Sequence, residues 1–166
     1  MDGAFSKALE LLALRDHFRA ELARKLERRG FPPDEIEAAL QRLETLGYLD
    51  DVRAAARFVE VNAVRKGWGR HRLERELERR GVARDVAARA AGAGPETEAA
   101  ALASALGRAL RRARPGWWRL PRERARMVSS LVRRGFDAED ARRAVDRLAA
   151  ERESDDHAPD DEPRDP

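Results

Sequence analysis

Three segments of the chain repeat one pattern of apolar and polar positions. Each has apolar residues four positions apart, then two arginines, a glycine and another apolar residue, and the segments span 22–31, 73–82 and 127–136. Positions i and i+4 share one helical face, cations are favoured in the last turn, and glycine readily adopts the left-handed conformation that ends many helices. The pattern predicts three equivalent helices, which end at Gly30, Gly81 and Gly135.

A further helix is predicted on each side of these glycine-capped helices. Upstream amphipathic segments run over 5–14, 52–64 and 97–113, and Asp50 or Asp51 is suited to cap the second. Downstream, an acid follows each glycine by four positions, where the first turn of a helix favours negative charge. The chain is therefore predicted to form three tandem three-helix repeats, over 1–47, 48–94 and 95–151. Since no repeat has a large apolar surface of its own, the repeats should pack end to end into an elongated, curved body.

The composition supports an all-α fold. The 166 residues are rich in Ala, Leu, Arg and Glu, which favour helices, and poor in the β-branched residues that favour strands. The absence of cysteine excludes disulfides, thiolate metal sites and a cysteine nucleophile. No apolar run approaches the roughly 20 residues that span a bilayer, and no signal peptide is evident, so a cytoplasmic protein without membrane contact is expected.

Charge divides the chain into two parts. The net charge is +3, yet residues 151–166 carry eight acids and two arginines, so the preceding residues are strongly basic. A basic body attracts nucleic acid or acidic protein surfaces. The segment 152–166 has three prolines and almost no apolar residue, which predicts a disordered acidic tail.

No catalytic constellation is visible in the sequence. The three histidines, His17, His71 and His157, lie far apart, and no metal-ligand spacing occurs. The turn at 67–69 is too short to cradle a phosphate and lacks the Lys-Ser/Thr of a P-loop. We therefore expect a protein that is not an enzyme and needs no cofactor or metal.

Two basic clusters with tryptophans are the candidate contact sites. Arginine forks beside aromatic rings suit phosphate contact, base stacking or insertion into an acidic groove. The alternative is a solvated basic face with the tryptophans as core anchors, and the arginines before each glycine could serve only the helix dipole. The predicted contact residues are Arg65, Lys66, Trp68, Arg70, Arg72, Arg75, Arg112, Arg114, Arg119 and Arg122.

The middle repeat carries landmarks of a known family. The runs Leu46-Gly47-Tyr48-Leu49-Asp50-Asp51 and Lys66-Gly67-Trp68-Gly69, followed by the glycine-capped helix at 72–82, resemble the RecX family, the bacterial regulators of the RecA recombinase. The flanking repeats are similar to those of the same family, so the resemblance covers about residues 5–150. Family members usually have Ser where Phe18 stands, and we expect Asp16 to cap that helix instead.

The resemblance implies a crescent-like helical protein that lodges in the groove of the RecA–DNA filament. We expect the protein to be a monomer. Such proteins mainly inhibit RecA ATP hydrolysis, strand exchange and co-protease activity, and so influence homologous recombination, DNA repair and the SOS response. Two other functions remain open from the residues. The chain could bind single- or double-stranded DNA directly without specific RecA contact, or it could be a helical adaptor for another acidic partner.

Overall fold

The computed structural model describes residues 3–92 and 94–157, and within these ranges the chain contains helices and loops but no strand. In chain order the helices are α1 (Gly3–Leu14), α2 (Arg19–Glu27), α3 (Pro33–Thr45), α4 (Asp51–Lys66), α5 (Arg70–Arg79), α6 (Arg84–Ala91), α7 (Pro95–Leu110), the short 3₁₀ helix η1 (Trp117–Arg119), α8 (Pro121–Arg133) and α9 (Ala138–His157).

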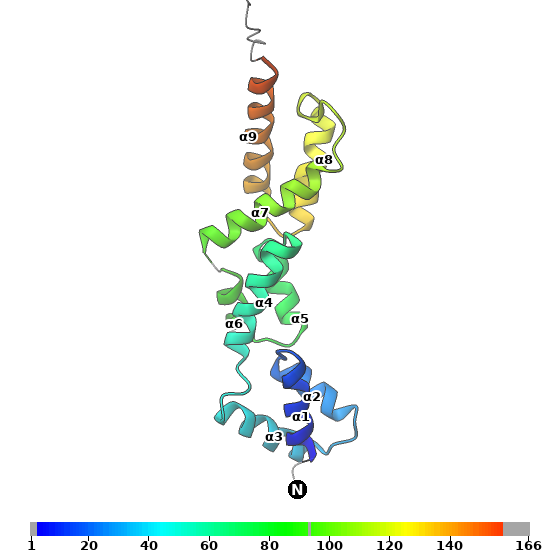
Figure 1. Ribbon diagram of the computed structural model, residues 1–166, viewed down its shortest axis with the longest axis vertical. Helices are drawn as coiled ribbons and strands as arrows, with labels where there is room; N and C mark the ends of the chain where they lie inside the picture. Colours follow the sequence, from blue (N-terminus) through cyan, green and yellow to red (C-terminus); the bar gives the residue numbers. More distant parts are fainter. Residues whose placement is uncertain (1–2, 93, 158–166) are drawn as a thin grey trace, which may run out of the picture.

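The helices follow one another along the long axis in groups of three (Figure 1). The group α1–α3 lies at one end, α4–α6 in the middle and α7–α9 at the other end. The predicted all-α, elongated, tandem three-helix architecture is confirmed. The exact boundaries between repeats stay a prediction. The predicted disorder is wrong for 152–157, because α9 continues to His157 and Arg119 pairs with Asp156 in its last turns. The rest of the predicted tail, 158–166, lies outside the described residues.

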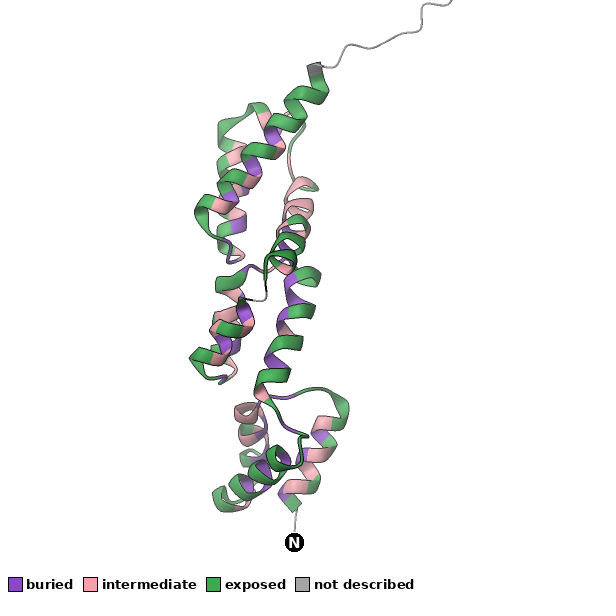
Figure 2. Cartoon of the chain, turned by 90° about the vertical axis from the view of Figure 1, so that its left-hand side faces the viewer, coloured by how far each residue is buried: buried purple, intermediate pink, exposed green. Residues whose placement is uncertain are grey.

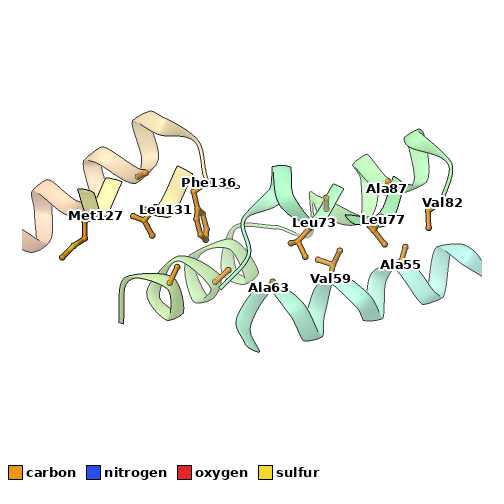
Figure 3. Close-up of a cluster of buried hydrophobic side chains, with 14 of the residues drawn as sticks. Ala55, Val59, Ala63, Leu73, Leu77, Val82, Ala87, Met127, Leu131 and Phe136 are labelled. Atoms are coloured by element: carbon orange, nitrogen blue, oxygen red, sulfur yellow. The ribbon is translucent and has the colours of Figure 1, made fainter. Parts of the chain in front are cut away.

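The apolar residues form two separate cores. One belongs to the first repeat and includes Leu22, Leu26 and Leu40, which are fully buried. The other runs continuously through the second and third repeats: Leu73 and Leu77 of α5 face α4, and Leu131 and Phe136 continue the row into the third repeat (Figure 3). Buried stripes alternate with exposed ones on the helices (Figure 2), as expected for amphipathic helices that pack through one face. The second and third repeats thus form one packed unit, to which the first is attached.

The three glycines end their helices as predicted. Gly30, Gly81 and Gly135 have φ angles of +83°, +91° and +94°, a conformation that glycine adopts without steric cost. The amide after each glycine donates to a leucine carbonyl five positions earlier, which is the bonding of a Schellman cap. Of the side chains that follow, Val82 and Phe136 are buried in the core, and Phe31 is partly buried against the core of the first repeat.

The first repeat is attached to the second through Phe18. This side chain is 4% exposed and belongs to the core of the other two repeats, where it meets the edge of Phe58 with 6.3 Å between ring centroids. The N-cap of α2 is therefore a buried ring that cannot accept a hydrogen bond. Instead the first amide of α2, at Arg19, donates to Asp51 Oδ1 over 2.8 Å. The expectation that Asp16 caps α2 is wrong, because Asp16 forms an ion pair with Arg57 at 3.1 Å.

The second and third repeats meet backbone to backbone. The amides of Gly69 and His71, at the start of α5, donate to the carbonyls of Arg134 and Gly135 at the end of α8, over 2.8 and 3.1 Å. The positive end of one helix dipole thus meets the negative end of the other. A Cβ on Gly69 would lie 2.5 Å from the backbone of Gly135, so only glycine permits this approach.

Candidate functional site

Several basic side chains gather where α4 ends against the third repeat. Gly67 closes α4 in the left-handed conformation, with φ +61°. Two guanidinium groups from the third repeat bind the last carbonyls of α4: Arg108 donates to Arg65 O over 2.5 Å, and Arg134 donates to Lys66 O over 2.9 Å. Each bond pairs a cation with the negative end of a helix dipole. These arginines therefore hold the end of α4 in place while adding charge to it.

Trp68 is half-buried at the edge of the core. Its ring lies 6.4 Å from the ring of Phe58, so one part packs against apolar side chains. Lys66 Nζ lies 4.3 Å from the ring centroid and the Arg72 guanidinium 4.5 Å from it, both in cation–π geometry. The two interpretations of this tryptophan are combined in one residue: it anchors the turn in the core and also positions two cations.

We call the following group the junction cluster: Arg65, Lys66, Trp68, Arg72, Arg108, Arg112 and Arg134. Among the described residues, none of its six cations forms an ion pair with a carboxylate. The pKa of Arg134 is lowered, chiefly by burial and in addition by the neighbouring charges of Arg108, Arg72 and Arg112. Cations that crowd together without a counter-ion favour binding of an external anion.

The structure brings five of the ten predicted contact residues into this cluster. Arg70 and Arg75 are exposed on α5, close in sequence to the cluster, and neither forms an ion pair within the described ranges. The remaining three lie around η1 and the start of α8. No described hydrogen bond, ion pair or cation–π contact links Arg114, Arg119 or Arg122 to the junction cluster.

The arginine-rich segment around η1 has its own partners. Arg119 forms an ion pair with Asp156 and lies 5.9 Å from the ring of Trp118. Arg114 is at the limit of pairing with Glu123, at 4.0 Å. Trp117 is 4% exposed and packs in the core, so the core-anchor alternative is correct for this residue.

Two members of the junction cluster were not among the predicted contact residues. Arg108 belongs to the arginine run of 108–126, and Arg134 is one of the arginines that precede each glycine. Arg134 does donate to a carbonyl at the end of a helix, but this is Lys66 O of α4 and not a carbonyl of its own helix. The available signal was the excess of arginine over acid, which could not show which arginines meet across the junction.

The described residues hold no group of three or more His, Asp or Glu that could bind a metal ion. Within the same ranges, no helix is long and apolar enough to cross a membrane.

Helices in tandem triplets, with one core in the first triplet and another that runs through the second and third, define a class of all-helical repeat protein. Two family models match the chain: the first three-helix domain of RecX over residues 4–43 and the second three-helix domain of RecX over 50–90. The regulatory protein RecX of Prosthecochloris aestuarii is 34% identical, covering 87% of this chain and 93% of that protein. The regulatory protein RecX of Halorhodospira halophila is 40% identical, and the match covers 92% of this chain and 90% of that protein. The chain belongs to the RecX family.

Solved structures agree on the fold. The crystal structure of RecX from Lactobacillus salivarius superposes with a TM-score of 0.75 over 89% of this chain and 94% of that one, at 17% identity. A second crystal structure, of regulatory protein RecX, superposes with a TM-score of 0.70 at 21% identity. The match covers 89% of this chain and 70% of that one. The arrangement of helices is therefore retained although few side chains are shared.

Proposed function

We propose that this protein binds the RecA–DNA filament and inhibits RecA, lowering its ATP hydrolysis, strand exchange and co-protease activity. The observation that carries the proposal is the junction cluster, six cations that form no ion pair with any described carboxylate, on an elongated helical body. Membership of the RecX family of regulatory proteins supports RecA as the target. In this function the protein acts by occupying a surface, and its side chains need to bind anions rather than transform a substrate.

The position of the cluster fits a ligand with several negative groups. The Arg65 and Lys66 side chains come from α4 and that of Arg72 from α5, whereas Arg108 belongs to α7, Arg112 to the turn that follows α7, and Arg134 to the end of α8. Because several elements from two repeats contribute, the surface is fixed by tertiary packing and loses little entropy when it binds. Acidic side chains of RecA protomers and DNA phosphates are both suitable ligands, and a filament presents them together.

The decisive experiment measures single-stranded-DNA-dependent ATP hydrolysis by the cognate RecA at concentrations of this protein well below that of RecA. Inhibition at such ratios is expected, since a bound regulator affects many protomers of one filament. If hydrolysis falls only when enough protein is present to coat the DNA, the protein competes for the strand. The direct nucleic-acid-binding function would then replace the proposal.

Charge-reversal variants test the role of the junction cluster. Arg65 and Arg112 have exposed side chains without described ion pairs, so the double variant Arg65→Glu/Arg112→Glu should fold normally. Its inhibition should require about tenfold more protein or more, because reversed charges repel the anions they formerly bound. The matched control is Arg142→Glu/Arg147→Glu, two exposed arginines of α9. Equal effects of the two double variants would show that only overall charge matters and would refute a defined site.

A further inference from the structure

A recess that contains no residue of the junction cluster lies between the first and second repeats. It has a volume of about 540 Å³ and is formed by the end of α1, the loop that follows it, the outer face of α4 and Arg80. We call it the inter-repeat groove.

Aliphatic side chains on the wall of the inter-repeat groove face solvent. Leu14, the last residue of α1, is 83% exposed, and Val61 of α4 is 52% exposed. Single exposed aliphatics are ordinary, but two on the wall of one recess indicate a surface that is covered in a complex.

Polar atoms at the groove lack partners. His17 is only 3% exposed, and its Nδ1 lies 2.9 Å from the carbonyl oxygen of Arg15, so Nδ1 carries the proton and donates it. Burial lowers the pKa of His17, which keeps the ring neutral. Its Nε2 and the Nε of Arg80 are buried and have no hydrogen-bond partner in the described structure. Such unpaired buried atoms are rare in folded proteins, and two of the four among the described residues line this recess.

The charge of the groove is positive. Among the described residues that line it, Arg15, Arg57 and Arg80 face a single acid, Asp16. Asp16 pairs with Arg57 at 3.1 Å, while Arg15 and Arg80 share Glu21 at 3.3 and 2.7 Å. Three guanidinium groups thus share two carboxylates, and the side chains of Arg15 and Arg57 remain more than half exposed.

We propose that the inter-repeat groove docks an amphipathic segment of a partner protein, with an aliphatic side chain against Leu14 and Val61 and a carboxylate facing Arg15 and Arg57. Nucleic acid is disfavoured here, since Leu14 and Val61 offer a phosphate no hydrogen bond. The rings that line the groove are also covered, because Phe18 is 4% exposed and Phe58 packs against Phe18, Trp68 and the Arg80 guanidinium, which leaves little surface for a base to stack on. The proposal rests on the proposed function, in which the partner is a protomer of the RecA filament. The groove then contacts protein, while the junction cluster receives anions.

The test replaces the aliphatic pair with acids in the full-length protein. Leu14→Asp/Val61→Asp alters side chains that are mostly solvent-exposed, so the helices should persist, which circular dichroism verifies. The matched control is Leu46→Asp/Val52→Asp, an aliphatic pair of similar exposure outside the groove. Two affinities are measured for each protein: for preformed filaments of the cognate RecA, by co-sedimentation, and for a labelled single-stranded oligonucleotide without RecA, by fluorescence anisotropy.

We expect the groove variant to bind filaments at least tenfold more weakly while its affinity for the oligonucleotide changes no more than that of the control. Filament binding equal to that of the unmodified protein would overturn the proposal for the groove and leave the proposed function intact. A parallel loss of oligonucleotide binding would assign the groove to nucleic acid and also overturn the proposal. If the unmodified protein does not bind filaments at all, the proposed function fails and this inference fails with it.

Discussion

Replacing Gly69 with alanine tests the junction between the second and third repeats. The backbone of Gly69 has φ −80° and ψ 169°, which alanine adopts freely, so backbone strain plays no part. The added Cβ would lie 2.5 Å from the carbonyl carbon and oxygen of Gly135 and 2.6 Å from the amide of Phe136. These are backbone atoms and cannot rotate away, so the two repeats must separate.

The cost follows from the contacts that separation breaks. The hydrogen bonds from Gly69 to Arg134 and from His71 to Gly135 would be lost or lengthened, at about 1 kcal/mol each. Overpacking at such a site typically costs a further ~1–3 kcal/mol. We therefore expect Gly69→Ala to lower the free energy of unfolding by about 3–5 kcal/mol. The junction cluster spans this interface, so inhibition of RecA should weaken as well.

Urea unfolding followed by far-UV circular dichroism measures the effect, and Gly107→Ala is its control. Gly107 lies within α7, where an added Cβ meets only the Arg111 side chain, at 3.7 Å. The same chemical change should there stabilise the protein by about 0.5–1 kcal/mol, because alanine favours helix over glycine. If Gly69→Ala is as stable as the unmodified protein, the close backbone approach described here is refuted.

Three further substitutions probe the first repeat, its attachment and the start of the second repeat. Phe18→Ala should cost about 3–5 kcal/mol and raise the hydrogen exchange of α4 near Phe58, whereas unchanged exchange would contradict the attachment through this ring. Asp50→Ala removes the acceptor of the Arg53 amide, at 2.9 Å, and should cost about 1 kcal/mol in urea unfolding. His17 is held neutral in the folded state, so the unfolded chain binds the extra proton and stability falls as the pH drops below the ordinary pKa of 6.5. In the variant His17→Gln, the free energy of unfolding should fall less between about pH 6.5 and 5 than in the unmodified protein. If both proteins show the same pH profile, His17 is not the cause of the pH dependence.

Repetition made the helices and their order predictable from the sequence. The recurring i, i+4 apolar pairs and the glycines that follow are local signals, because the residues that define each helix and its cap lie within ten positions of one another. The RecX-like landmarks at 46–51 and 66–69 are local as well. The basic charge of the body was equally plain from the composition, although composition could not select which arginines act together.

The attachment of the repeats was decided by tertiary structure alone. Asp51 caps the helix that begins 32 residues earlier, and Arg134 binds a carbonyl 68 residues away. Phe18 stands where a capping side chain is expected because it is needed in the core of the neighbouring repeats. Such contacts join segments whose spacing depends on how whole repeats pack, and no short-range periodicity encodes that. The sequence by itself thus determined the helices, the glycine caps and the surplus of positive charge, whereas packing determined the junction cluster and the inter-repeat groove.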